Sequence, residues 1–436
     1  DLSLSGLAAL ADYSCEFEPD VESIWPLTFV QGEETVFSAR GQVRRVEETA
    51  FGLKIAFKLY DRHFDLGELG ARNRAALLRE RLAANSPDIS KLVPSEYKQL
   101  CSEVLHLLRQ YESILGDAEG DDKVAEHFGG DFLEACETAI RPAWRSLWRD
   151  ANRLVRPLED DKPIEAAARR FTELVLTPEF ARGPIWGRSY EKPLGYPGDF
   201  EIMKYVYDWR REGTTRYEKL LHMIGLDVAE CIGTRMLVVK ETIEEIVASR
   251  AGREPVRIAS LGCGPAREVE LYLKDRQAPS APVAFTLIDQ ESRALSTAYE
   301  RSYPYAVTTN DVSIDCLNIS FMELIRASGR QESRLEPQDF IYTVGLIDYL
   351  SLKLARSLVS ALYEKLKPGG LLVIGNMNDT PVGNLWPMEY ICDWRLHYRT
   401  DAQMRELASH LPTDEMWTKT DPTGRVYMLY VWKPKA

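Results

Sequence analysis

The chain has 436 residues, of which 45% are apolar and 28% are charged, and it contains no run of 18 apolar residues. These values exclude a disordered polymer and predict a globular protein of two or three domains without a membrane span. Asp and Glu total 67 against 54 Lys and Arg, a formal charge of -13. This charge repels phosphate backbones, so we expect no nucleic-acid partner.

The first half of the chain changes its hydrophobic period near residue 65. Short alternating runs over residues 28–60 predict a small β-rich module, which we assign to residues 1–65. From 66 to 185 the period becomes 3.6, which predicts a helical accessory region. Its expected helices cover residues 68–84, 97–115, 131–155 and 164–176.

The segment 183–199 is dense in glycine, proline and aromatic residues, a composition that argues against both a helix and a central strand. Asp199 is a candidate N-cap for a helix over residues 200–209, and a long amphipathic helix follows over 229–246. Because the segment directly precedes the last domain, we expect Tyr190, Tyr196 and Asp199 to belong to a lid over a ligand. The alternative is a rigid connector.

From residue 255 onward, expected strands and helices alternate. The strands cover residues 256–261, 283–288, 339–344 and 371–374, and helices begin near 267, 291 and 353. This alternation predicts an α/β fold over residues 186–436, with a doubly wound, Rossmann-like parallel sheet covered by helices on both faces. The last alternating run, 425–432, has no long crossover before it and is expected to form a terminal antiparallel hairpin.

The first of these strands ends in a glycine-containing turn, Leu261-Gly262-Cys263-Gly264-Pro265-Ala266. Gly262 and Gly264 permit a tight turn and a close approach of a ligand. Asp289 ends the next strand about 25 residues later, where a carboxylate can accept hydrogen bonds from ribose hydroxyls. No third glycine follows, which argues against NAD. The turn therefore predicts another nucleoside-containing cofactor, and a purely structural turn is the alternative.

Together with a later Lys367-Pro368-Gly369-Gly370 turn, these motifs resemble class I S-adenosylmethionine (SAM)-dependent methyltransferases over residues 186–436. In that family the glycine turn approaches the methionine part of SAM, the acid of the second strand holds the ribose, and a polar and an apolar residue bracket the adenine. The resemblance implies SAM as the cofactor. The candidate cofactor-binding residues are Tyr190, Gly262, Cys263, Gly264, Asp289, Gln290, Asn318, Ile319 and Thr343.

Three further segments, 192–200, 345–351 and 388–400, are similar to bacterial proteins labelled as 3-hydroxypalmitic acid methyl ester biosynthesis proteins. This likeness implies methyl transfer to a small-molecule acceptor, such as a carboxylate or hydroxyl of a fatty-acid-like or secondary metabolite. The same turn and acid also suit transfer or cyclisation of the aminocarboxypropyl arm of SAM. A non-catalytic SAM-binding regulatory module is the alternative from another class.

The acceptor is expected beyond the carboxyl ends of the strands, where open parallel sheets bind their ligands. The segment after the fifth strand mixes aromatic residues with charges of both signs, although surface ion pairing explains these charges equally well. The candidate catalytic residues are Tyr190, Glu389 and Tyr390. The candidate acceptor-binding residues are Tyr196, Asp199, Asn376, Trp386, Trp394, Arg395 and His397.

The remaining signals are weaker. The seven cysteines and six histidines are scattered without the spacing of a metal site, so we expect no metal and a reduced, cytoplasmic setting. Cys263 is expected to fill its turn rather than to react. Arg40 and Arg44 make the segment 39–60 faintly similar to PilZ domains, which bind cyclic di-GMP, but the partner motif of that family is missing. The oligomeric state stays open.

Overall fold

The computed structural model describes residues 2–3, 6–11, 20–31, 34–49, 52–62, 71–72, 75, 79, 91–117, 127–128, 131–250, 254–276, 281–308, 311–328, 334–413 and 415–435. The chain divides into two compact units, residues 1–89 and 90–436. Most of the helix expected over residues 68–84 lies outside the described residues.

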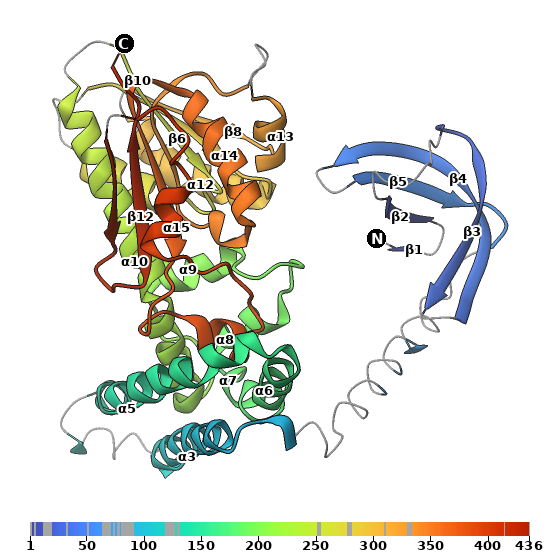
Figure 1. Cartoon of the computed structure of the whole chain (residues 1–436), viewed down its shortest axis with the longest axis vertical. Coiled ribbons are helices and arrows are strands. Elements are labelled where there is room, and N and C mark those ends of the chain that lie inside the picture. Colours follow the sequence, from blue (N-terminus) through green and yellow to red (C-terminus); the bar gives the residue numbers. More distant parts are fainter. Residues whose placement is uncertain are drawn as a thin grey trace. The chain divides into compact units, whose positions relative to one another are not determined.

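The first unit contains a five-stranded antiparallel sheet (Figure 1) with the strand order β1-β2-β5-β4-β3. Its inner face is apolar because alternate positions of β4 and β5 carry Val43, Ile55 and Phe57, which are buried. The sheet confirms the β structure expected from the alternating runs. The strands are β1 (Leu2–Ser3), β2 (Gly6–Ala11), β3 (Ile24–Gln31), β4 (Glu34–Thr49) and β5 (Gly52–Leu59).

The second unit begins with helices that confirm three of the expected segments. Asp131 starts α5 by accepting hydrogen bonds from the backbone N–H groups of Leu133 and Glu134. The buried faces of these helices carry large aromatic residues, among them Trp144, which is fully buried. The helices are α3 (Ser95–Asp117), α5 (Phe132–Val155), η1 (Arg156–Asp160), α6 (Lys162–Val175) and α7 (Thr177–Phe180).

The expectation that residues 183–199 contain no helix is wrong, because α8 covers Pro184–Glu191. Pro184 occupies the first turn, where a proline costs nothing because its missing N–H would have no helical partner. The helix ends at Lys192, which adopts a left-handed conformation with φ 50°. Asp199 does cap the next helix, α9 (Phe200–Asp208), as predicted, and the long helix α10 (Arg216–Ser249) follows.

The second unit also contains a seven-stranded sheet with the order β11-β12-β10-β9-β6-β7-β8. The five strands from β10 to β8 are parallel, and β12 lies antiparallel between β10 and β11. This confirms the doubly wound α/β fold with a terminal antiparallel hairpin. The strands are β6 (Val256–Leu261), β7 (Val283–Ile288), β8 (Val312–Leu317), β9 (Gln338–Thr343), β10 (Leu366–Met377), β11 (Glu415–Thr420) and β12 (Val426–Trp432).

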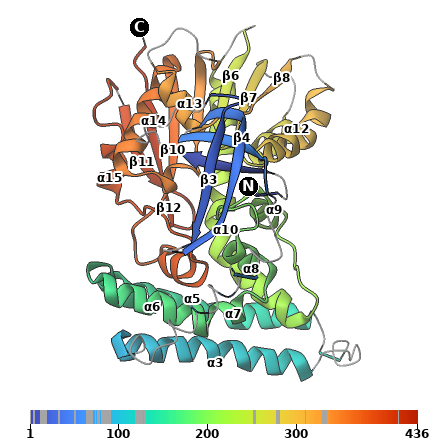
Figure 2. The ribbon, with the colours of Figure 1, turned by 90° about the vertical axis from the view of Figure 1, so that its right-hand side faces the viewer.

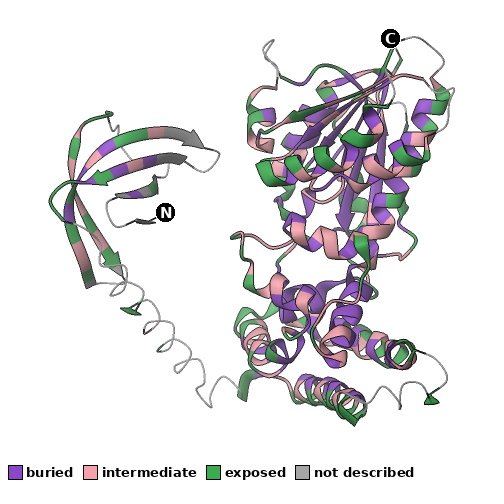
Figure 3. Ribbon diagram, turned by 180° about the vertical axis from the view of Figure 1, so that it is seen from behind, coloured by how far each residue is buried: buried purple, intermediate pink, exposed green. Residues whose placement is uncertain are grey.

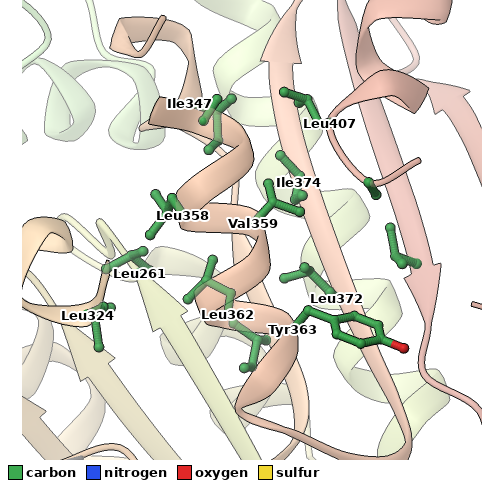
Figure 4. Packing of buried hydrophobic residues seen from close by; sticks show 14 of the residues in the cluster. Leu261, Leu324, Ile347, Leu358, Val359, Leu362, Tyr363, Leu372, Ile374 and Leu407 are labelled. Atoms are coloured by element: carbon green, nitrogen blue, oxygen red, sulfur yellow. The ribbon is translucent and has the colours of Figure 1, made fainter. Parts of the chain in front are cut away.

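Helices cover this sheet (Figures 1 and 2), and its strands are largely buried while the outer helix faces are exposed (Figure 3). In Figure 4, Val359 of α14 lies beside Ile374 of β10, and leucines such as Leu362 and Leu372 belong to the same apolar cluster on one face of the sheet. Each fully buried leucine contributes about 1.5–3 kcal/mol. The remaining helices are α11 (Arg267–Asp275), α12 (Ser292–Ala306), α13 (Phe321–Arg326), η2 (Ile347–Tyr349), α14 (Leu352–Glu364), η3 (Trp386–Ile391) and α15 (Asp401–Glu406).

The strand order reverses between β6 and β9. The chain first adds β7 and β8 on one side of β6, and it then crosses back to place β9 and β10 on the other side. Crossovers that run in opposite directions leave a crevice between the carboxyl ends of the two central strands, and open α/β sheets bind ligands there. The topology therefore favours a ligand site at the ends of β6 and β9.

Candidate functional site

A cavity of about 290 Å³ lies at this reversal point. Its wall includes Leu261 and Val344, at the ends of β6 and β9, together with Asp289 after β7 and Met377 at the end of β10. The long helix α10 closes one side with Ile232 and Met236 among others. The cavity therefore collects the carboxyl ends of four neighbouring parallel strands.

The glycine turn forms part of this wall. Gly262 has φ 65° and Gly264 has φ 51°, conformations that side chains with a Cβ rarely adopt. No heavy atom lies within 4 Å of the place that a Cβ of Gly264 would occupy. Ala266 also has a left-handed conformation, with φ 45° where α11 begins, a strained geometry of the kind that clusters at functional sites. The backbone of the turn is therefore accessible to a ligand at Gly264, where no side chain intervenes.

Asp289 ties the turn to the next strand. Its Oδ2 accepts a hydrogen bond from the N–H of Gly264 at 2.9 Å, and its Oδ1 accepts one from the N–H of Glu291 at 2.9 Å. Burial raises the pKa of Asp289 above its usual value, although these backbone bonds oppose the shift. A carboxylate has about four acceptor positions, so these bonds leave part of its acceptor capacity for a ligand.

Acidic residues outnumber basic residues in the cavity wall. Among the described lining residues, Glu268, Asp289 and Asp348 are acidic and Arg235 is the one basic residue. Glu268 accepts a hydrogen bond from the hydroxyl of Tyr342 at 2.7 Å, and burial raises its pKa from 4.5 to about 7. Burial also raises the pKa of Asp348, whose Oδ1 accepts a hydrogen bond from the N–H of Met377 at 2.6 Å.

The segment that precedes α9 reaches the same cavity. Tyr196 and Gly198 line it, and Gly198 has φ 71° and is so closely packed that a Cβ would meet the Trp394 ring at 2.3 Å. Tyr349 lies between the two segments, because its hydroxyl donates to the carbonyl of Pro197 at 3.3 Å and accepts from Trp394 Nε1 at 2.9 Å. The loop is thus held against residues that follow β9 and β10.

The structure brings about half of the sequence-predicted site residues together. Cys263 is buried in the turn and burial raises the pKa of its thiol, which keeps the thiol protonated. The predicted residues that line the cavity are Tyr196, Gly262, Cys263, Gly264, Asp289, Gln290, Ile319 and Trp394.

Four candidates outside the cavity wall have other partners. The hydroxyl of Tyr190 donates to Glu173 of α6 at 2.6 Å, and Asp199 forms a bidentate ion pair with Arg188. The side-chain amide of Asn318 donates to the backbone carbonyl of Asp289 at 3.0 Å. Thr343 is fully buried at the end of β9.

The candidates Trp386, Glu389 and Tyr390 instead face the helices that precede the sheet. Trp386 Nε1 donates to the hydroxyl of Tyr97 at 2.8 Å. Glu389 forms an ion pair with Arg169, whose guanidinium also lies 4.5 Å from the ring centre of Tyr390. These contacts join α3 and α6 to η3.

The last three candidates also lie outside the cavity wall. Asn376 is buried, and its amide donates to the carbonyl of His397 at 2.8 Å. The side chains of His397 and Arg395 are exposed.

The sequence analysis assigned no role to several lining residues. Glu268 lies only four residues beyond Gly264, and Arg235 interrupts the apolar stripe of α10 between Ile232 and Met236. A charged residue inside an apolar stripe is a signal that could have revealed Arg235. Tyr207 has no comparable signal, because aromatic residues are common on buried helix faces.

In the described part of the chain, no group of three or more His, Cys, Asp or Glu is arranged to hold a metal ion. No helix within the same residues combines the length and the apolar character that crossing a bilayer requires.

No protein-family model matches the chain, and no curated protein does either. Among solved structures, the chain is similar to a possible exported protein from Bordetella parapertussis, with 16% identity over 67% of this chain and 96% of that chain and a TM-score of 0.43. It is also similar to magnesium protoporphyrin IX methyltransferase from Synechocystis PCC 6803 with bound S-adenosylhomocysteine (12% identity, 57% and 98% covered, TM-score 0.39). Human N-acetylserotonin methyltransferase in complex with SAM is a third (15% identity, 62% and 70% covered, TM-score 0.34).

Proposed function

We propose that this protein is a SAM-dependent methyltransferase that acts on a small-molecule acceptor in the cytoplasm. Bound SAM would supply a methyl group on a positively charged sulfonium, which a nucleophile attacks in line. The chain's own task is to bind the cofactor, to aim the acceptor and to exclude water. The residues proposed to hold the cofactor include Gly262, Gly264, Asp289, Gln290 and Ile319.

The charge of the cavity is the observation that carries the proposal. Three carboxyl groups and one arginine line it. A ligand with a sulfonium and an amino group is attracted to such a wall, whereas the two negative charges of a pyrophosphate are repelled. The wall therefore favours SAM over a dinucleotide, in agreement with the missing third glycine.

The shape of the site also suits this ligand. A volume of about 290 Å³ is close to the lower end of the roughly 300–1,000 Å³ typical of small-molecule sites. The open space beside Gly264 admits a close approach of the ligand to the backbone. The remaining acceptor capacity of Asp289 suits the hydroxyls of a ribose.

The acceptor is proposed to enter beside Tyr196 and Trp394. Both line the cavity, and the loop that carries Tyr196 is held by a chain of two hydrogen bonds through Tyr349. Opening and closing of this loop would admit the acceptor and then exclude water. Glu389 and Tyr390 are proposed to support the acceptor side of the cavity without touching the acceptor, because both side chains contact Arg169 of α6.

Calorimetric titration of SAM, S-adenosylhomocysteine and NAD into the full chain tests the cofactor. We expect both adenosyl ligands to bind and NAD not to bind. Asp289→Ala should weaken binding of the adenosyl ligands by about 1–3 kcal/mol, through lost ribose hydrogen bonds. Asp315→Ala, which removes an exposed carboxylate on β8, is the matched control. Equal affinities in all three proteins would refute the cofactor placement.

The coproduct separates the reactions that one pocket can perform. Mass spectrometry after incubation with SAM and a metabolite extract should detect S-adenosylhomocysteine. Methylthioadenosine would instead indicate transfer of the aminocarboxypropyl arm. Tight SAM binding without any turnover would favour a regulatory binding module.

A further inference from the structure

Arg235 is a buried cation inside the cavity whose hydrogen bonding is incomplete. It belongs to α10, it is 7% exposed, and it lines the cavity. Its Nη1 is buried without a hydrogen-bond partner, and its ion pair with Asp348 is long, at 3.8 Å. A guanidinium offers five N–H donors, and leaving a buried charged donor unused is costly.

A neighbouring arginine shows what complete pairing looks like in this part of the fold. Arg399 is equally buried, and its guanidinium donates to the carbonyls of Ile347 at 3.0 Å and Leu350 at 2.5 Å and to the side chain of Asn376. The backbone that surrounds Arg399 therefore satisfies it. Arg235 has no such set of carbonyls among the described residues.

The surroundings of Arg235 leave space for its guanidinium. A Cβ on Gly345 would lie 3.0 Å from Arg235 Nη2, so the glycine lets the guanidinium lie against the backbone that follows β9. Asp348 is only a partial partner, because its Oδ2 lies 3.8 Å from Arg235 Nη1, which is too far for a hydrogen bond. The unused donors are therefore available to a ligand rather than to the protein.

We propose that Arg235 is the anion-binding residue of this cavity and that a carboxylate of the bound ligand completes its hydrogen bonding. A carboxylate matches the planar fork of a guanidinium. A phosphate dianion fits less well, because Glu268, Asp289 and Asp348 line the same cavity and would repel its second charge.

Two ligands could supply this carboxylate, SAM or the acceptor. The inference rests on the proposed function only where SAM is the source. The first source is the amino-acid end of SAM, which would extend from Asp289 at β7, across the glycine turn, toward β9. The second source is an apolar acid used as the acceptor, since Ile232, Met236 and Met388 also line the cavity.

Calorimetry on Arg235→Met separates these sources. The ligands are SAM, 5′-methylthioadenosine, which lacks the carboxylate, and decanoate, which is added both with and without S-adenosylhomocysteine. Arg276→Met is the matched control, because Arg276 is a similarly buried arginine that is paired with Asp311 at 2.7 Å and does not line the cavity. Arg235→Lys keeps the charge but loses the fork, and it serves if the Met variant does not fold.

If SAM supplies the carboxylate, Arg235→Met loses at least about tenfold in affinity for SAM and keeps its affinity for methylthioadenosine. If the acceptor supplies it, SAM binding is unchanged and decanoate binding falls by a similar factor. Arg235→Lys should lie between the wild type and the Met variant.

A folded Met variant that binds all three ligands as the wild type and the Arg276 control do would overturn the inference. Failure of the wild type to bind SAM and decanoate alike would also overturn it. If the wild type binds decanoate in an Arg235-dependent way but does not bind SAM, the inference holds and the proposed function fails.

Discussion

Replacing Glu268 by Gln should change how the stability of the protein depends on pH. Burial raises the pKa of the Glu268 carboxyl from 4.5 to about 7, so the folded state holds this proton more tightly than the unfolded state does. The stabilising proton is fully bound below pH 4.5 and is lost as the pH rises through 7. Each pKa unit corresponds to 1.36 kcal/mol, so the difference between the two values corresponds to about 3.4 kcal/mol.

Glutamine keeps the acceptor that Tyr342 needs and cannot ionise. We therefore expect Glu268→Gln and the wild type to differ by a constant amount at low pH, and the variant to gain about 3 kcal/mol relative to the wild type by pH 8. Urea unfolding of both proteins from about pH 4.5 to 8.5 measures this difference, and other titrating groups cancel in it. Glu300→Gln, at an exposed position of α12, is the control. A pH-independent difference for Glu268→Gln would refute the reasoning.

Three further predictions concern the cavity and its support. The affinity for SAM should rise as the pH passes about 7, because ionised Glu268 attracts the positively charged sulfonium. The rise should be smaller for S-adenosylhomocysteine, which lacks the sulfonium. Calorimetry at pH 6 and pH 8 measures both affinities. Gly264→Val should cost about 1–2 kcal/mol of stability at φ 51° and should lower SAM affinity by more than about tenfold, because its side chain would enter open cavity space. Asn152→Ala should lower the free energy of unfolding, measured in urea, by about 2–5 kcal/mol. The substitution removes the hydrogen bonds that Asn152 makes to the carbonyl of Gly383 and to the N–H of Trp386. An unchanged unfolding midpoint would contradict this role.

The elements of the α/β unit were predicted well because their signals are local. The sequence predicts the strands 256–261 and 283–288 with the bounds that the structure shows, since mainly apolar runs end at Gly262 and Asp289. Composition does not predict α8, because proline disfavours the interior of a helix whereas Pro184 lies in the first turn. A composition rule failed there because the position of a residue within an element decides its effect.

The candidate site residues also fall into two groups, those near the turn and the strand ends and those in the segment after β10. Several residues of the glycine turn and the strand ends, such as Gly264, Asp289 and Ile319, line the cavity because the carboxyl ends of neighbouring parallel strands meet at one edge of the sheet. Residues chosen for their chemistry in the segment after β10, such as Glu389 and Tyr390, face the helices instead. A sequence shows which side chains a segment carries but not which neighbour each face of that segment meets.

The sequence by itself determined the α/β fold of the last unit and the turn with its carboxylate, because periodicity and turn chemistry act over a few residues. The tertiary structure alone decided the charge of the cavity. Arg235, Glu268 and Asp348 come from α10, α11 and the segment after β9, and they meet only when these elements assemble. The raised pKa values of Glu268 and Asp348 and the incomplete pairing of Arg235 arise from burial by several elements, which no single segment of the sequence encodes.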